Sequence, residues 1–195
     1  MTAMLAPLRT AFLVFNRRIA APLLRTGGGP LVSTSIAASM LLLRTTGRTS
    51  GLVREAPLGY TVIDGRVVVM AGYGRDAHWF RNAVATPDVE VLLPRALIAG
   101  RAHEITEPDE RRAAARTLIG SMGVVGRLTV GDIRAKSDAE VDVLAQAFPI
   151  LAITPTAVLP GPFDPGGIGT RLNTAAWALL GAGTLAVAVW HRRKS

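Results

Sequence analysis

The sequence predicts a mainly β fold of the α+β class, a small β-barrel with helices packed outside it, followed by a C-terminal apolar helix. Two observations lead to this fold class. Five or six segments of strand length are joined mainly by hairpins, and two or three helix-like segments accompany them. The chain has 195 residues, of which 49% are hydrophobic, which is enough for one packed domain with appendages. We expect an N-terminal amphipathic helix (1–30), the barrel (31–156), a Pro/Gly linker (157–171) and the apolar helix (172–191).

The first part has the pattern of an amphipathic helix over residues 5–25. Apolar side chains recur at steps of three and four, with arginines between them, and glycines 27 to 29 end the pattern. A secretory signal peptide is the alternative, but Arg9 and the pair Arg17-Arg18 interrupt its apolar region. We therefore expect a retained helix that packs on the domain or rests on a membrane surface.

The strands of the barrel follow as apolar runs separated by turn signals. The run "SMLLLRT" has strand length, and "VREAPLGYTVI" and "RVVVMAG" flank the dipeptide Asp64-Gly65, which is typical of a tight hairpin turn. The runs "VEVLLP" and "RALIAGRAHEI" form a second hairpin around Pro94-Arg95, and "PILAITPT" is the last strand.

Three other segments are assigned more by helix signals. "AHWFRNAVAT" is a short helix that ends before Pro87. Thr106 and Asp109 have the spacing of a capping box, which predicts that Thr106 caps a helix containing "ERRAAARTLIG". "SDAEVDVLAQAF" is a second helix, whereas the glycines of "SMGVVGRLTVGD" leave that segment unassigned.

The last part of the chain predicts a membrane-attached tail. Residues 155–169 contain four prolines and four glycines, as a linker does. Residues 172–190 carry no charge; the 17 from 174 to 190 would span roughly 26 Å as a helix, just short of a hydrocarbon core of about 30 Å. A buried core helix is the alternative. The basic "HRRK" that follows would place the C-terminus in the cytoplasm and the domain outside, against the cytoplasmic domain expected below, so the topology stays open.

The charges exclude some classes of function and favour others. The net charge is +8, and residues 1–54 hold seven arginines without any Asp or Glu, so the positive field suits an anionic ligand or lipid. Aromatic residues make up only 5% and show no base-stacking motif, so we expect no nucleic-acid partner. The absence of cysteine and the wide separation of His78, His103 and His191 predict no metal site.

The first candidate site is "RTTGRTSG", residues 44–51, between two predicted strands. A guanidinium group offers a fork of donors that suits phosphate oxygens, hydroxyl groups add donors, and glycines 47 and 51 would let backbone amides face an anion. The segment is no P-loop, because the Gly-Lys-Ser/Thr ending and the following helix are missing. A polar turn that satisfies its own backbone is an equal alternative. The anion-binding candidates are Arg48, Thr49, Ser50, Gly51 and Arg54.

The second candidate site is "MAGYGRDAHWFRN", residues 70–82. Gly72 and Gly74 allow a planar ligand to approach the backbone, and Tyr73 can stack on such a ligand. The alternative is a hairpin exit with an aromatic core plug. One hairpin separates the two sites, so a small barrel would place them side by side, which favours binding. The chain has no nucleophile elbow, HExxH helix or paired carboxylates, so a bound cofactor would supply any chemistry.

These segments resemble a known family. "LLLRTTGRTSGLVREAPLGY" and "DGRVVVMAGYGRDAHWFRNAVATPDVEV", with the elements after them, are similar to the deazaflavin-dependent nitroreductases of actinobacteria over roughly residues 12–155. Those proteins are split β-barrels related to the FMN-binding, pyridoxamine-phosphate-oxidase-like group. The resemblance implies reduced coenzyme F-420, which carries a phosphate and a polyglutamate tail, and hydride transfer to a small lipophilic substrate such as a quinone or a nitroaromatic compound.

The resemblance also implies roles for individual residues. The anion-binding candidates match the phosphate segment, and two residues of the next strand match the sides of the ring. Tyrosines that line the substrate side in nitro-reducing members are missing from "SMGVVGRLTVGDIRAK", Thr49 replaces a frequent Lys, and Gly72 replaces a frequent Ser, so nitro reduction is not expected as the main activity. The implied positions beyond the phosphate segment are Pro57 and Leu58 beside the ring, Ala71, Gly72, Tyr73, Gly74 and Arg75 in the loop facing it, and Trp79 and Asn82 as its buttress.

Two rival interpretations remain at this point. One is a non-catalytic binding protein that holds a lipid, haem or another flat ligand on the same barrel, and the other is an FMN-dependent relative. Split barrels of this type often dimerise, so the resemblance allows a homodimer for this chain, although the sequence shows no identifiable interface. With F-420 as cofactor, we expect a cytoplasmic domain that the C-terminal helix attaches to the lipid of the cell membrane.

Overall fold

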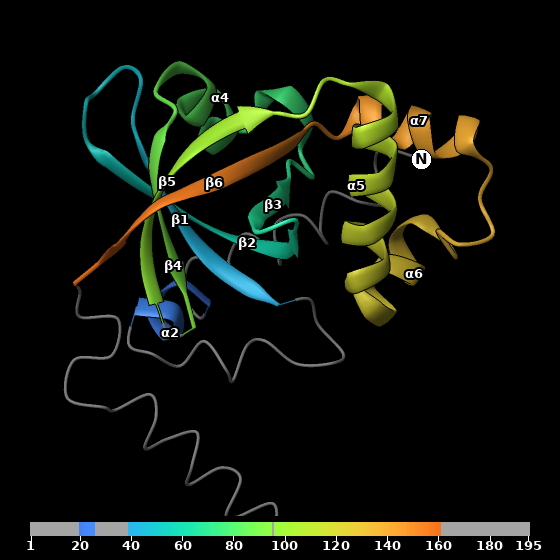
Figure 1. The fold of residues 1–195 in the computed structure, drawn as a ribbon, viewed down its shortest axis with the longest axis horizontal. Coiled ribbons are helices and arrows are strands. Elements are labelled where there is room, and N and C mark those ends of the chain that lie inside the picture. Colours follow the sequence, from blue (N-terminus) through green and yellow to red (C-terminus); the bar gives the residue numbers. More distant parts are fainter. Residues whose placement is uncertain (1–19, 26–38, 95, 161–195) are drawn as a thin grey trace, which may run out of the picture.

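The computed structural model describes residues 20–25, 39–94 and 96–160, which form a six-stranded barrel with helices around it (Figure 1). Most of the predicted N-terminal helix and the whole apolar helix (172–191) lie outside the described residues. No helix in the described ranges has both the length and the apolar character needed to cross a membrane. The elements are α2 (Ala21–Arg25), β1 (Met40–Thr46), β2 (Val53–Ile63), β3 (Arg66–Met70), the 3₁₀ turn η2 (Gly74–Asp76), α4 (His78–Ala85), β4 (Asp88–Leu93), β5 (Ala96–Glu104), α5 (Pro108–Ser121), α6 (Gly123–Val130), α7 (Asp138–Ala147) and β6 (Ile150–Leu159).

The strands close into a barrel in the order β1-β2-β3-β6-β5-β4, and every neighbouring pair is antiparallel. This confirms the predicted barrel with helices outside. Both predicted hairpins are present, β2 with β3 and β4 with β5. Asp64 and Gly65 have φ values of 50° and 75°, the positive values that a type I′ turn requires.

The barrel interior is filled by alternate residues of the strands. Leu41 and Leu43 of β1, Val69 of β3 and Leu151 of β6 belong to one buried cluster. The same cluster includes Phe80, so the short helix α4 contributes to this core. Because side chains alternate across a strand, Leu42 points outward and joins a different cluster.

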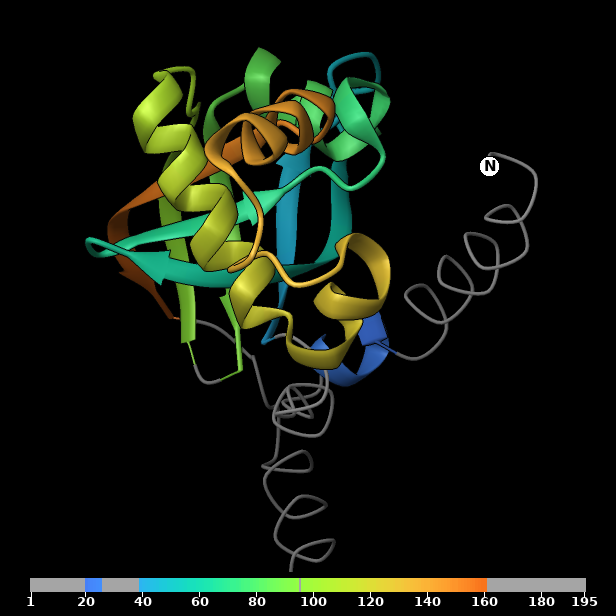
Figure 2. The same cartoon turned by 90° about the vertical axis from the view of Figure 1, so that its right-hand side faces the viewer.

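The outer surface of the barrel is covered in two places. Helices α5 and α7 pack over β3 and β6, where Val68 and Ala152 meet Leu118 and Val141. Figure 2 shows α5, α6 and α7 together on this side of the barrel. The short helix α2 packs through Leu24 on β1, β4 and β5.

Helix α2 is also held to the barrel by charge. Arg25 donates to Glu55 of β2 through both Nε and Nη2, with 2.7 Å between Nε and the carboxylate. Arg44 of β1 donates to the other oxygen of Glu55 and to Glu90 of β4. These ion pairs occupy Arg25 and Arg44, the first two arginines of the described residues, so the two side chains are not available for a ligand.

Two local predictions were wrong, and both failures involve proline. Helix α5 begins at Pro108 with Glu107 as N-cap, and Thr106 makes no capping bond. A residue before proline is held extended, so Glu107 cannot be helical and the start moves to the proline. Strand β6 continues to Leu159, three residues beyond the expected end of the barrel at 156. Pro155 lies at a bulge opposite Gly100, where proline is tolerated.

The segment left unassigned at the sequence level is helix α6. Its two glycines have different roles. Gly123 begins the helix with a φ of 57°, whereas Gly126 allows close packing, since a Cβ atom there would lie 2.6 Å from the carbonyl oxygen of Ile119 in α5. Gly126 is therefore a contact residue rather than a helix breaker.

Candidate functional site

The first candidate segment forms a tight loop between β1 and β2. The amide of Gly47 donates to Leu52 O at 2.8 Å, and the amides of Ser50 and Gly51 donate back to Gly47 O at 3.1 and 2.7 Å. Gly51 has a φ of 66°, which explains why a glycine stands there. The loop itself uses the amides of Gly47, Ser50 and Gly51, so these three donors do not face an anion in this structure.

The candidate anion-binding residues of this segment lie at the surface. Arg48, Thr49, Ser50, Gly51 and Arg54 are all exposed. We call Arg48 and Arg54 the hook arginines. Arg54 Nη2 lies 3.3 Å from Ser50 Oγ, and Arg48 Nη1 lies 3.2 Å from Asn82 Oδ1. Both contacts are to neutral oxygens, so neither contact supplies a negative charge to the guanidinium group.

The hook arginines differ from most arginines of the fold. Eight others form at least one ion pair within the described ranges, among them Arg25, Arg75 and Arg112. Neither Arg48 nor Arg54 has a carboxylate partner among the described residues. Two cations at one strand connection, without a carboxylate partner, favour the binding of an anionic group.

The second candidate segment leaves β3 and leads into α4. Ala71 is buried and donates its amide to Pro149 O at 2.9 Å, which ties the loop to the start of β6. Gly72 and Tyr73 are exposed, and Gly72 has open space where a side chain would lie. Gly74 has a φ of 70°, and a Cβ atom there would lie 3.4 Å from Ala147 O of α7. The loop thus presents backbone and one tyrosine to solvent.

Arg75 of this loop has a structural contact. Its guanidinium donates to both carboxylate oxygens of Glu104, at 2.5 and 3.1 Å, and lies over the ring of Phe80 at 5.9 Å. The ring of Trp79 meets that of Phe80 edge-to-face, with 6.1 Å between the centroids. Arg75 therefore fixes the loop against the end of β5.

Helix α4 connects the two candidate segments. It follows the second segment directly, and its Asn82 accepts hydrogen bonds from both the amide and the guanidinium of Arg48 in the first. Asn82 is only 4% exposed and also donates to Thr45 Oγ1 at 3.4 Å. The sequence did not single out Thr45. The signal was its place two residues after Leu43 on the inward face of β1, where a polar side chain must find a partner.

Pro57 and Leu58 lie on β2 beside the loop. They pair with Leu42 and Leu41 of β1, and β3 pairs with β2 only from Tyr60 onward. Pro57 thus stands where β2 has only β1 beside it, which suits a residue without an amide hydrogen. Leu58 packs on the barrel interior with Tyr60, and burial raises the pKa of the Tyr60 phenol above its usual value.

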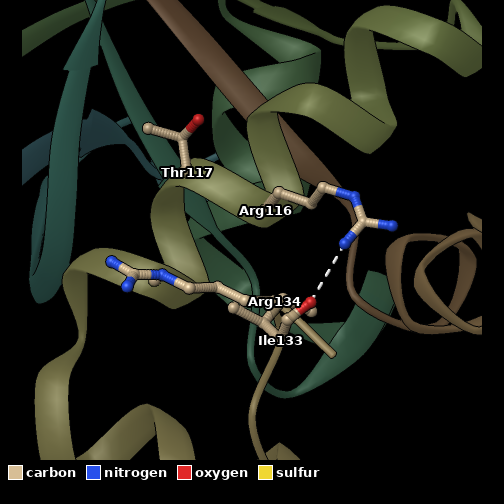
Figure 3. Close-up of a pocket in the computed structure, with 5 residues that line it drawn as sticks. Arg116, Thr117, Ile133 and Arg134 are labelled. Atoms are coloured by element: carbon tan, nitrogen blue, oxygen red, sulfur yellow. Dashed lines mark hydrogen bonds between the residues drawn. The ribbon is translucent and has the colours of Figure 1, made fainter. Parts of the chain in front are cut away.

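A cavity lies elsewhere, between α5 and the loop after α6. It has a volume of about 330 Å³ and is lined by Arg116, Thr117, Gly120, Ile133 and Arg134 (Figure 3). Arg116 donates to Ile133 O and Lys136 O at 3.0 Å and pairs with Asp138. Figure 3 shows the guanidinium groups of Arg116 and Arg134 pointing to opposite ends of the cavity, so they do not converge on one ligand.

Comparisons with known proteins give the family. The model of the F420H(2)-dependent quinone reductase family matches residues 16–125, which is more than half of the chain. A solved F420-H2 dependent reductase (FDR-A) is 24% identical, with coverage of 58% of this chain and 92% of that one and a TM-score of 0.41. A conserved hypothetical protein from Mycobacterium tuberculosis is 19% identical (67% and 84% covered, TM-score 0.45), and the haem storage protein HutZ from Vibrio cholerae is 16% identical (60% and 82%, TM-score 0.41). The matched residues contain both candidate segments, and the chain belongs to the F420H(2)-dependent quinone reductase family, whose cofactor is coenzyme F-420.

Proposed function

We propose that this F-420-dependent reductase transfers hydride to a small lipophilic acceptor, a quinone, and that the hook arginines bind the phosphate of the cofactor. One observation carries the second part. Arg48 and Arg54 lie at the same β1–β2 connection, are exposed, and have no carboxylate partner in the described structure, whereas most other arginines there have one. A cofactor with a phosphate and a polyglutamate tail supplies the missing negative charge.

The donor set fits such a cofactor. A guanidinium group can donate two parallel N–H bonds to phosphate oxygens. The exposed residues Thr49 and Ser50 add hydroxyl groups to the same segment. Reduced F-420 supplies a hydride when bound, which is the chemistry that the side chains of this chain lack. The protein's part is to hold the cofactor by the hook, to present the backbone of Gly72 to Gly74 to the ring, and to orient the acceptor.

Anaerobic oxidation of reduced F-420 by a water-soluble quinone tests this function. We expect turnover that saturates with quinone. The Arg48→Ala variant should need roughly 10- to 100-fold more cofactor, because a charge-assisted contact is worth about 1.5–3 kcal/mol. Arg101→Ala is the matched control, because it also removes an exposed arginine but on β5, outside the β1–β2 loop. The Arg101 guanidinium lies 3.7 Å from the exposed carboxylate of Asp88. Binding of F-420 without turnover on any acceptor would contradict the reductase and support a binding protein, and activity with FMN alone would contradict the cofactor.

We also propose that residues 172–191 attach the domain to the cytoplasmic face of the cell membrane. The support for attachment is compositional, since residues 172–190 carry no charge. The cytoplasmic side follows from the F-420 cofactor, whereas the basic "HRRK" alone would place the domain outside. The chain contains no cysteine, so a single cysteine introduced after Trp190 can be labelled selectively. The full chain should sediment with membranes, while a chain ending at 160 should not. A full chain that stays in the supernatant would refute the attachment, and labelling by an impermeant reagent will report on which side the tail ends.

A further inference from the structure

Two buried polar side chains lie beneath the hook. Thr45 and Asn82 are the polar residues of the described structure that are classed as buried, at 2% and 4% exposure. Thr45 stands near the end of β1, and Asn82 stands in α4. A buried polar group is destabilising unless it is hydrogen-bonded, so two such groups in contact must be satisfied by each other and by their neighbours.

Their hydrogen bonds form one directed chain. Arg48 can only donate, so Asn82 must turn its oxygen to it, and Oδ1 accepts from the amide at 3.3 Å and from Nη1 at 3.2 Å. This leaves Nδ2 to donate to Thr45 Oγ1 at 3.4 Å. The hydroxyl of Thr45 then donates to the backbone oxygen of Arg54, also at 3.4 Å. These hydrogen bonds connect one hook arginine to the other.

We propose that Asn82 and Thr45 are positioning residues that set the two hook arginines for the cofactor phosphate. This inference rests on the proposed function of the hook. Asn82 fixes the amide and the guanidinium of Arg48, and Thr45 fixes the backbone of Arg54. The hook arginines are exposed, whereas Asn82 and Thr45 are buried, so the two buried residues hold the arginines from the protein side and leave their outer side to the ligand.

The physical effect is pre-organisation. A free arginine side chain loses rotamer freedom when it binds phosphate, and a side chain already held in place loses less. The bonds of the chain are long, at 3.2 to 3.4 Å, so each is weak alone. We therefore expect a moderate effect from each variant, roughly three- to tenfold in affinity, within the range of coupling between contacting residues.

Titration of the full chain with oxidised F-420, followed by fluorescence, measures the effect. Asn82→Ala and Thr45→Val should each raise Kd, and Thr45→Ser should restore it because it keeps the hydroxyl. Thr46→Val is the matched control: it is the same substitution one residue further, on the other face of β1, where the hydroxyl has no hydrogen bond within the described structure. Unchanged Kd values for both Asn82→Ala and Thr45→Val would overturn the proposal.

A double-mutant cycle separates positioning from direct contact. If Asn82 acts through the Arg48 guanidinium, Asn82→Ala should raise Kd by less than about twofold when Arg48 is already Ala. Fully additive effects would overturn positioning and make Asn82 an independent contributor. The thermal midpoint of each variant checks whether a variant acts through loss of folding instead. The midpoints of the variants should not follow the order of their Kd values, and Thr45→Ser should restore the Kd whatever its midpoint.

A second readout does not depend on F-420 at all. In the ligand-free chain, the Nε–H resonance of Arg48 in NMR spectra should shift and broaden in Asn82→Ala, while that of Arg101 stays unchanged. An unchanged Arg48 signal would overturn the positioning role even if F-420 binds. If the wild-type chain fails to bind F-420 but the Arg48 signal responds, the proposed function fails and the buried chain of hydrogen bonds stands.

Discussion

Phe80→Ala should destabilise the fold and loosen the hook together. Phe80 is 3% exposed and anchors α4 in the cluster that fills the barrel, and the same helix carries Asn82. Removing the ring takes away the packing that holds α4 in place. The hydrogen bonds from Asn82 to the Arg48 loop should weaken as a consequence.

The magnitude follows from the contacts of the ring. Burial of a phenylalanine side chain is worth about 1.5–3 kcal/mol, and the edge-to-face contact with Trp79 adds about 0.5–1.5 kcal/mol. The Arg75 guanidinium over the ring adds about 0.5–1 kcal/mol, since that arginine is exposed. We therefore expect a loss of about 3–5 kcal/mol in the free energy of unfolding, the range typical of Phe→Ala in cores.

Urea unfolding followed by far-ultraviolet circular dichroism measures this loss. Val84→Ala on the same helix is the control, because Val84 is 52% exposed and its truncation should change stability by less than about 0.5 kcal/mol. A loss below about 1 kcal/mol for Phe80→Ala would refute the role of α4 as a packed plug. So would an unchanged F-420 affinity under conditions in which the variant is folded.

Three further predictions concern the backbone and the charges. Gly74→Ala should lower stability by about 1–2 kcal/mol in thermal melts because of the φ of 70°, while Gly72→Ala, which has open space and no positive φ, should be near neutral. Ser137→Ala removes the capping box of α7 and should lower the unfolding free energy by about 1 kcal/mol in urea titrations. The hydrogen bond from Arg112 holds the pKa of the Asp142 carboxyl group below its ordinary value of 3.8. The stabilisation that Asp142 contributes is therefore present above pH 3.8 and is lost as the pH falls through the lower folded pKa. Arg112→Ala should accordingly flatten the dependence of the unfolding free energy on pH below 3.8.

Much of the fold could be predicted because local signals and tertiary structure agree. The Asp64-Gly65 turn fixes the register of β2 with β3, and alternation on β1 fixes which side chains enter the barrel. The failures lie where a distant contact decides. In the sequence, Gly126 indicates a helix break, whereas in the structure it allows close contact with Ile119 of α5. Pro155 indicates a linker in the sequence, whereas in the structure it pairs with Gly100 of β5.

The sequence indicates the exposed residues of the candidate site but not the hydrogen bonds that distant residues make with them. Exposed arginines and glycines in "RTTGRTSG" are visible in a sequence, but the use of the loop amides by the loop itself is not. Thr45 was missed because a threonine in a strand is ordinary, and only its burial against Asn82 makes it unusual. Arg48 and Arg75 both stand next to a glycine in a candidate loop, so the sequence does not distinguish them. Only the structure shows that Arg75 is bound by Glu104.

The most direct test of the account compares the affinity for F-420 with that for the same deazaflavin without its phosphate tail. With the wild-type chain, F-420 should bind at least roughly tenfold more tightly, because the hook contributes a charge-assisted contact. In Arg48→Ala the difference should shrink, while Arg101→Ala should retain it. Equal affinity for the two ligands in the wild-type chain would contradict the central claim that Arg48 and Arg54 bind the cofactor phosphate.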